Sequence, residues 1–183
     1  MDRLAPRVAT LLVAATLAAG CGVRDSGALA PSQWPGTLGI AHVTETGTPV
    51  GFGGPMMLIN ASTEQLIIED VTIDRVDAGL EMVGWSTRDV AHTNATGVQE
   101  PYPPPYSQSS GPTRIDPSQR RSVDGKMLGE TELVVGLRAT ASGRHSASGV
   151  RVRYLDGTGL HTMVFALVMT LCAPPRDFGR GCA

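Results

Sequence analysis

A long alternating segment near the C-terminus constrains the fold of this 183-residue chain more than any other feature. Over residues 149–155 apolar side chains alternate with arginines, and a period of two predicts a half-buried β-strand. Residues 156–159 read Asp-Gly-Thr-Gly, which favours a tight turn. Residues 160–172 then carry apolar side chains on both faces of a second strand. Such a strand belongs in the middle of a sheet or is covered on both sides.

Other strand candidates follow one another at short spacing, and no stretch keeps the 3.6-residue period of a helix. In one of them, 66–76, the apolar face shifts by one residue at Glu69-Asp70, which predicts a β-bulge or a corner between sheets. About seven strands separated by turns predict an all-β chain, folded as an antiparallel immunoglobulin-like β-sandwich. The remaining candidates are 37–44, 55–60, 80–85 and 133–139.

The interval 88–122 differs from the rest, because it is rich in proline and polar residues and has almost no apolar periodicity. We expect it to be one long loop, since a connection of this length without its own structure is usually functional or disordered. Its segment 101–106, Pro-Tyr-Pro-Pro-Pro-Tyr, favours a stiff polyproline II path that can dock on a partner at small entropic cost. Tyr102 and Tyr106 are therefore candidate partner-binding residues, with a plain solvated loop as the alternative.

The first residues read as an export signal. Arg3 and Arg7 precede a 12-residue apolar run, Val8 to Ala19, which is too short to span a bilayer. The residues that close this run, Leu17-Ala18-Ala19-Gly20-Cys21, resemble the lipobox of bacterial lipoproteins. That resemblance implies cleavage before Cys21 and attachment of diacylglycerol to its thiol. The membrane contact is then a lipid rather than a helix.

The lipobox divides the chain into three parts. Residues 1–20 are expected to be the signal peptide, 21–35 the lipidated cysteine and a flexible tether, and 36–183 a single β-sandwich domain. An ordinary secretory signal or an uncleaved anchor remain as alternatives. The expected location is the extracytoplasmic face of a cell membrane.

Cys172 and Cys182 form an even pair once Cys21 is assigned to lipid. Outside the cytoplasm such a pair predicts a disulfide, and the proline and glycine residues between them permit a closed turn. Two reduced thiols or half of a metal site are the alternatives.

The charge and motif content exclude several classes of function. A formal net charge of −2 gives no electrostatic case for nucleic acid. The histidines His42, His92, His145 and His161 fall in separate segments, and no serine lies in a nucleophile elbow. We therefore expect no catalytic residues, no cofactor and no enzyme activity.

One metal-handling alternative has residues attached to it. His161-Thr162-Met163 resembles the His-x-Met element of sandwich-fold copper chaperones, and Met56-Met57 could supply further thioether ligands of the kind that suits Cu(I). Met163 shares its face with Phe165 and Leu167, so burial in the core explains it without copper.

Together these observations predict a lipid-anchored extracytoplasmic lipoprotein. We expect a non-catalytic binding or structural module of the cell envelope, attached to the membrane through its lipid and contacting an envelope protein that the sequence does not identify. A copper- or other metal-handling lipoprotein is the alternative.

Overall fold

All the regular secondary structure in the described part of the chain consists of β-strands, and no helix occurs there. The computed structural model describes residues 27–31, 38–89, 97–105, 107, 111–117, 121–123, 126–128 and 131–174. The all-β prediction is confirmed. The strands are β1 (Leu29–Pro31), β2 (Leu38–Val43), β3 (Pro49–Phe52), β4 (Met57–Asn60), β5 (Leu66–Val76), β6 (Leu80–Asp89), β7 (Val98–Gln99), β8 (Thr113–Ile115), β9 (Arg121–Val123), β10 (Lys126–Leu128), β11 (Thr131–Ala139), β12 (Gly143–Asp156) and β13 (Gly159–Ala173).

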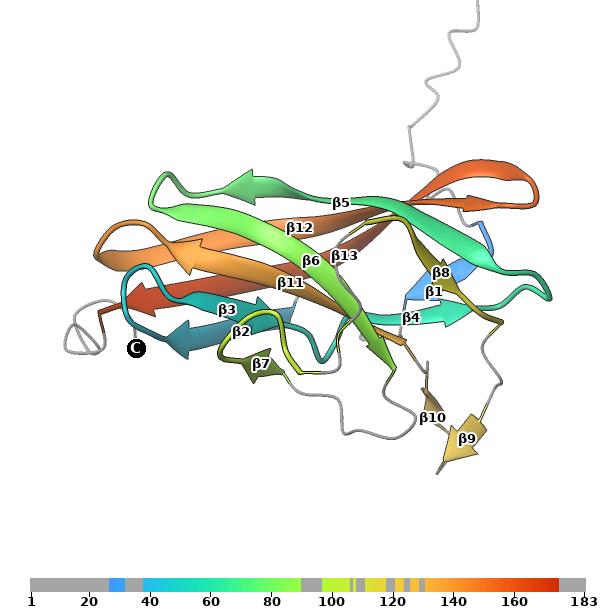
Figure 1. Cartoon of the computed structure of the whole chain (residues 1–183), viewed down its shortest axis with the longest axis horizontal. Coiled ribbons are helices and arrows are strands. Elements are labelled where there is room, and N and C mark those ends of the chain that lie inside the picture. The colour runs from blue at the N-terminus through green and yellow to red at the C-terminus, as the bar shows by residue number, and fades with distance from the viewer. Residues whose placement is uncertain are drawn as a thin grey trace, which may run out of the picture.

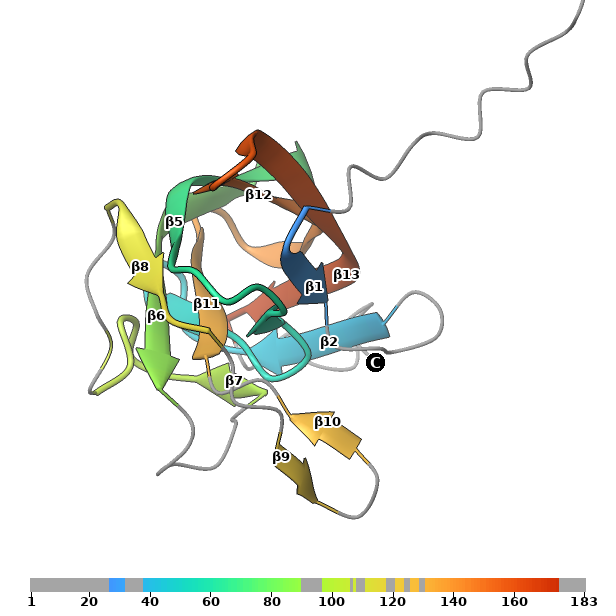
Figure 2. The same ribbon diagram turned by 90° about the vertical axis from the view of Figure 1, so that its right-hand side faces the viewer.

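Two larger sheets enclose a common interior, as the view along the long axis shows (Figure 2). Sheet A contains β1, β3, β4, β6, β7 and β11; its central strand β11 pairs with β6 on one edge and with β4 and β3 on the other. Sheet B has the order β2-β13-β12-β5-β8. Strands β9 and β10 form a separate two-stranded ribbon.

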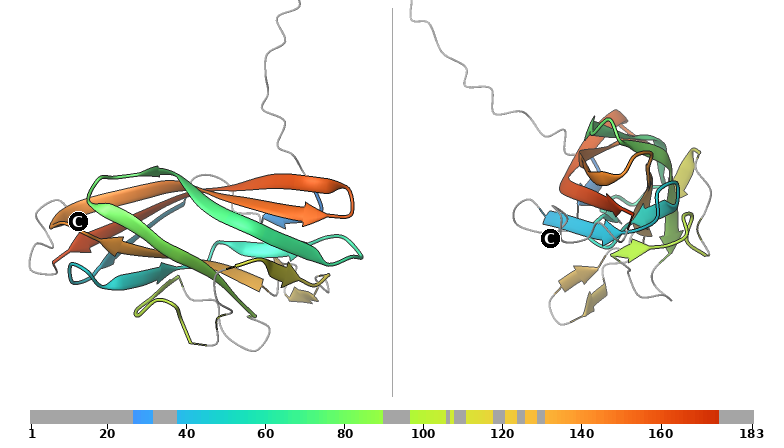
Figure 3. Two further views of the ribbon diagram at one scale, coloured as in Figure 1. Left: turned by 45° about the horizontal axis from the view of Figure 1, so that its top comes forward. Right: turned by 90° about the vertical axis from the view of Figure 1, so that its left-hand side faces the viewer.

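The hairpin of β12 and β13 is the longest pairing, running from Asp156 opposite Gly159 to Gly143 opposite Ala173. Its turn lies at one end of the elongated molecule, and the β5–β6 and β11–β12 turns lie at the opposite end (Figures 1 and 3). Strand β13 lies between β12 and β2. The expected mid-sheet position of residues 160–172 is therefore confirmed.

The bulge expected in 66–76 is present. Arg153 pairs with Asp70 and the next residue, Tyr154, pairs with Ile68, so Glu69 is the extra residue on β5. The insertion keeps both Ile68 and Val71 in the core, where they are 0% and 3% exposed.

The core fills the space between the two sheets. On β11 the alternate residues Leu133, Val135 and Leu137 point inward and are fully buried. Residues of the opposite face of β11 are also covered, since Glu132 is 0% and Val134 2% exposed. Sheet A is thus covered on its outer face too, and this second covered face holds the site described below.

Three expectations about the strands need correction. The sheets are not purely antiparallel, because β2 pairs with β13 in parallel. The described residues contain thirteen strands rather than about seven, since several strands are too short for periodicity to reveal. Residues 29–31, placed in the flexible tether, form β1 and pair with β4.

The interval 88–122 is not one unstructured loop. Its first two residues continue β6, and it contains β7, which joins sheet A, β8, which joins sheet B, and part of the β9–β10 ribbon. These strands have two or three residues each, so only their long-range pairing defines them. The signal peptide and Cys21 lie outside the described residues.

Candidate functional site

Three glycines lie side by side across sheet A and form a flat seat for an aromatic ring. Gly136 of β11 pairs with Gly51 of β3 and with Gly84 of β6. A Cβ at Gly136 would lie 2.5 Å from Cδ1 of Tyr102, and one at Gly51 would lie 3.3 Å from Cδ2. The tyrosine ring can therefore occupy this position only because these residues have no side chain. We call Gly51, Gly84 and Gly136 the glycine seat.

The segment that carries Tyr102 is attached to sheet A through its backbone. Strand β7 pairs with β3, placing Gln99 opposite Gly51. Before β7, the amide of Gly53 donates a 3.0 Å hydrogen bond to the carbonyl of Gly97; after it, the amide of Tyr102 donates a 3.1 Å bond to the carbonyl of Pro49. Residues 101–105 continue as bends and a turn rather than a regular polyproline helix.

Glu100 adds a side-chain attachment to the other sheet. Its Oε2 accepts a 3.0 Å hydrogen bond from Oγ1 of Thr44 and lies 3.3 Å from Nε2 of His42. His42 belongs to β2 of sheet B, so the segment 97–105 bridges the edges of both sheets. These attachments to both sheets hold Tyr102 at one place on the surface.

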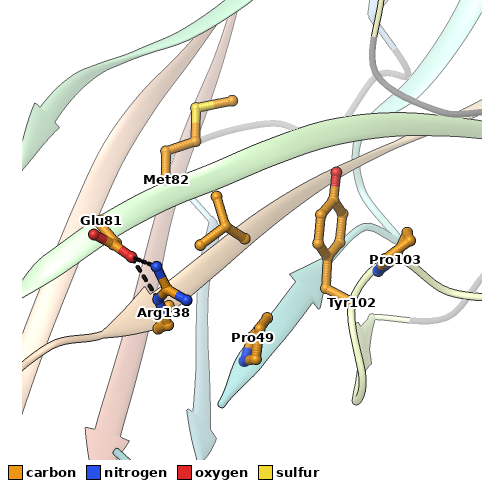
Figure 4. A pocket seen from close by; sticks show the side chains of 7 residues that line it. Pro49, Glu81, Met82, Tyr102, Pro103 and Arg138 are labelled. Atoms are coloured by element: carbon orange, nitrogen blue, oxygen red, sulfur yellow. Dashed lines mark hydrogen bonds and ion pairs between the residues drawn. The ribbon is translucent and has the colours of Figure 1, made fainter. Parts of the chain in front are cut away.

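A shallow open groove of about 530 Å³ lies beside the Tyr102 ring (Figure 4). Val83 is the extra residue of a bulge in β6, where Gly136 pairs with Gly84 and Leu137 pairs with Met82. The bulge places the Val83 side chain at the groove. The groove is lined by Pro49, Glu81, Met82, Val83, Tyr102, Pro103 and Arg138.

An ion pair between Glu81 and Arg138 lies at one end of this groove (Figure 4). The two side chains are 40% and 43% exposed, so solvent screens the pair and its contribution to stability is small. The groove thus combines apolar walls with two charged groups that remain accessible to a bound molecule.

The phenol of Tyr102 is the polar group of the groove with an altered acidity. Burial raises its pKa, and the interaction with the Ser86 side chain acts in the opposite direction. The phenol therefore stays protonated at neutral pH and is a hydrogen-bond donor. The apolar walls and the phenol donor suit binding by packing and hydrogen bonding.

A buried ion pair lies on the same outer face of sheet A. Arg88 and Glu132 are in contact, with side chains 6% and 0% exposed. The second carboxylate oxygen of Glu132 accepts a hydrogen bond from the amide of Gly54. Two charges taken out of water need each other, because removing one leaves the other without compensation. The pair thus fixes β6, β11 and the β3–β4 connection together.

A second polar cluster lies at the turn of β12 and β13. Asp156 accepts hydrogen bonds from Oγ1 and the amide of Thr158, at 2.6 and 2.7 Å, and from the amide of Ala28, at 3.2 Å. These bonds, the Thr158 hydroxyl foremost, hold the pKa of Asp156 well below its usual range, and the nearby His161 acts in the same direction.

The histidine of this cluster is not arranged as a catalytic relay. Its Nε2 lies 3.0 Å from Oδ1 of Asp156 and 2.8 Å from Oγ1 of Thr158. A relay requires the carboxylate and the hydroxyl on different ring nitrogens. The ring of His161 also stacks on Tyr154, with 5.5 Å between centroids. The cluster therefore closes the hairpin and packs against β1.

The residues of the metal hypothesis are His161 and Met163. Met163 is 7% exposed and belongs to the core, and Nε2 of His161 is occupied as described. Among the described residues no three His, Cys, Asp or Glu side chains come together in a way that could hold a metal ion. The burial of Met163 and the contacts of His161 favour structural roles for both side chains.

The remaining predicted site residues divide between the described and undescribed parts of the chain. Tyr102 lies at the groove, whereas Tyr106, Cys21 and Cys182 are outside the described residues. Cys172 is 1% exposed at the end of β13, and its pairing with Cys182 stays a prediction. Within the described ranges, no helix has the length and apolar character needed to cross a bilayer.

Sequence reasoning identified Tyr102 but missed the groove around it. Gly51, Gly84 and Gly136 are far apart in sequence, and nothing local to any of them indicates that they share a register. Val83 gave no signal either, because its outward direction depends on the bulge. Gly84 and Gly136 lie within the strand candidates 80–85 and 133–139, and a glycine inside a strand was the available hint.

Comparison with known proteins gives no family. No protein-family model and no curated protein matches the chain. Among solved structures, the Vibrio cholerae VesB protease matches with 8% identity and a TM-score of 0.37, covering 82% of this chain and 33% of the protease. The CooA pilin subunit from enterotoxigenic Escherichia coli matches with 11% identity and a TM-score of 0.40, covering 80% of this chain and 97% of the pilin. Similarities at this level carry no argument about function.

Proposed function

We propose that this protein is a lipid-anchored extracytoplasmic lipoprotein whose β-sandwich is a non-catalytic binding module of the cell envelope. The anchor is proposed from the charged start, the short apolar run and the small residues before Cys21. Two acyl chains on this cysteine hold a protein on a membrane without any spanning helix.

We also propose an immunoglobulin-like sandwich as the fold of the module. In that fold one sheet carries its second, fifth and fourth strands as neighbours, and the other carries the third, sixth and seventh. The order of β3 and β4, β11 and β6 in sheet A, and of β5, β12 and β13 in sheet B, supports this arrangement. Immunoglobulin domains typically carry a buried tryptophan on their third strand. The corresponding strand, β5, has no tryptophan, and Trp85 lies on β6 instead.

The groove beside Tyr102 is the proposed partner site, and its construction carries the proposal. A solvated loop needs no seat, yet Tyr102 is held on three paired glycines and its segment is bonded to both sheets. The resulting surface has apolar walls, is open and is fixed in place, as binding without large entropic cost requires. A short apolar or proline-containing segment of an envelope protein fits this chemistry.

Photo-crosslinking in native membranes tests the proposal. A photoreactive phenylalanine derivative replaces Pro103, which is exposed at the groove, and the covalent product is identified by mass spectrometry. The same protein is then given Val83→Glu, which places a charge in the groove. Val76→Glu is the matched control, because Val76 is 40% exposed and lies outside the groove.

We expect one crosslinked partner that disappears with Val83→Glu and persists with Val76→Glu. Crosslinks that are absent, or that both substitutions leave unchanged, would remove the groove as the binding site. The anchor is tested separately by intact mass of the mature protein, which should show acyl chains on an N-terminal Cys21. An unmodified mature chain would contradict the lipoprotein assignment.

A further inference from the structure

An apolar row crosses the outer face of sheet B at its β12–β13 turn. Leu160 pairs with Leu155, and Leu155 pairs with Ile67, so the three side chains lie side by side on β13, β12 and β5. Leu160 is 50% exposed, and the other two are half-buried. The residues that alternate with them along these strands point inward and fill the core. The three apolar side chains of the row face outward and are not part of that core.

The apolar surface continues along β13 away from the turn. Val164 is 44% exposed, Ala166 is exposed and Val168 is half-buried. On the neighbouring β2, Gly39 lies opposite Val168 and is also exposed. This outer stretch of β13 contains no charged side chain, although strands facing water normally carry them. Strand β13 thus lies in the middle of its sheet, while part of its outer face is exposed.

Arginines border the apolar row. Arg114 of β8 pairs with Ile67, and Arg153 of β12 pairs with Thr162 of β13; both arginines are exposed. Asp70 lies opposite Arg153, whereas the carboxylate of Asp156 is held by Ala28 and Thr158. Aliphatic side chains with arginines at their border match a lipid surface, since guanidinium groups bind phosphate and their stems cover apolar area.

The proposed anchor brings this end of the molecule to the membrane. The amide of Ala28 donates to Asp156, and the amide of Leu29 lies 3.4 Å from Oη of Tyr154, so the chain enters the domain at the β12–β13 turn (Figure 1). Only seven steps of the chain separate Cys21 from Ala28, and they span at most about 25 Å when extended. The β12–β13 turn is therefore tied close to the lipid, and the β5–β6 turn lies at the far end.

We propose that the outer face of sheet B around Leu160 and Val164 lies on the lipid surface, with Arg114 and Arg153 at the phosphate groups. This inference rests on the lipid anchor of the proposed function and adds an orientation to it. The outer face of sheet A, with the Tyr102 groove, is then directed away from the bilayer. A few side chains contact lipid only weakly. Attachment through Cys21 makes this contact effective, because it keeps the face of sheet B at a high local concentration near the membrane.

Fluorescence quenching on vesicles tests the orientation. The mature lipidated protein with Leu160→Trp is reconstituted in vesicles of equal parts phosphatidylcholine and phosphatidylglycerol that carry brominated acyl chains. Val76→Trp is the matched control, since Val76 is 40% exposed on the same sheet near the distant β5–β6 turn. The unsubstituted protein supplies the background of the native Trp34 and Trp85.

We expect the tryptophan at position 160 to be quenched at least about twofold more than the one at position 76, and Val164→Trp to give the same result. Equal quenching at all three positions overturns the orientation. Equal quenching together with sedimentation as a dimer assigns the face to a second copy instead. A chain without acyl groups at Cys21 overturns the anchor and this inference together, whereas acylation with equal quenching overturns only the inference.

Discussion

At the scale of single residues, the outer face of sheet A depends on two side chains that most sheets would place in water. Tyr102 covers the glycine seat, and Glu132 is buried with Arg88. An aromatic ring over glycines restores the packing that strand glycines lack. A buried carboxylate is tolerated when a cation and a backbone amide satisfy it. Both features stabilise a covered face through interactions made across the sheet.

Replacing Gly136 by alanine should displace the Tyr102 ring, because the new methyl group would lie 2.5 Å from Cδ1. We expect a loss of about 1–3 kcal/mol in the free energy of unfolding, as for other overpacked sites. The phenol pKa should also fall toward its ordinary value as burial decreases. Urea unfolding and an ultraviolet titration measure the two effects.

Gly39→Ala is the control for that substitution, since no atom lies within 4 Å of a Cβ at Gly39. It should change the free energy of unfolding by less than about 0.5 kcal/mol. Similar losses for both variants would show that Tyr102 does not depend on the glycine seat.

Replacing Glu132 by glutamine should remove the carboxylate that faces the buried guanidinium group of Arg88. The expected cost is about 3–5 kcal/mol in the free energy of unfolding, measured in urea. Adding Arg88→Met should recover part of that loss, because the buried positive charge that faced Glu132 is then gone. Glu81→Gln, in a pair about half exposed, should cost under about 1 kcal/mol; a Glu132→Gln cost as small as this would contradict the buried pair.

At the scale of elements, the β12–β13 hairpin organises one end of the molecule. Its turn residues bind one another, and Asp156 extends the network to Ala28 at the start of the domain. The same hairpin carries the apolar outer face described above. A single supersecondary element thus closes its own turn and holds the N-terminal strand.

The carboxylate of Asp156 should make stability depend on pH. Its pKa is depressed in the folded protein, chiefly by the Thr158 hydroxyl, whereas an unfolded aspartate titrates near about 3.9. The stabilisation is therefore complete above that value and is lost as the pH falls toward the folded pKa. The urea midpoint of Asp156→Asn should lie below that of the native protein at neutral pH, and the difference should shrink below about pH 4.

Asp74→Asn serves as the control in that experiment. Asp74 pairs with Arg151 at 2.9 Å, and the two side chains are 37% and 43% exposed. Its substitution should change the midpoint little at any pH. A pH-independent difference for Asp156→Asn would mean that charge plays no part in closing the turn.

At the scale of the whole molecule, the termini of the domain are attached at different places. The N-terminal strand β1 pairs with β4 and contacts the β12–β13 turn. The last described strand, β13, ends at the opposite end of the long axis (Figure 3). The predicted disulfide of Cys172 would restrict the chain at this end of β13, far from the proposed membrane contact.

The predicted pairing of Cys172 and Cys182 has a direct test. Thiol titration of the unfolded, unreduced protein should detect neither cysteine. Cys182→Ser should lower the free energy of unfolding by roughly 3 kcal/mol, as expected for a bridge closing about 11 residues. Two free thiols, or an unchanged stability, would exclude the disulfide.

The sequence predicted the long strands well because their patterns are local. The range 66–76 has the bounds of β5, and the bulge at Glu69 follows from the shift in its apolar face. The range 160–172 lies within β13. In these strands, alternation along the chain records which side faces the core, so no knowledge of partners is needed.

The candidate site was predictable only in part. The proline and tyrosine residues of 101–106 indicated a special segment, and Tyr102 does lie at the groove. Strand β3 went unpredicted because its four residues include Gly51 and have no extended pattern. The glycine seat and the groove arise from the register of β3, β11 and β6, which no single segment contains.

The sequence by itself determined the all-β class, the long hairpin and the residues that prefer the core, because side-chain period and turn chemistry act over a few residues. Only the tertiary structure decided that β2 pairs in parallel with β13, that the segment around Tyr102 covers sheet A, and that Glu132 is buried opposite Arg88. These features depend on contacts between residues far apart in the chain. Their energies exist only when the two sheets are already packed together.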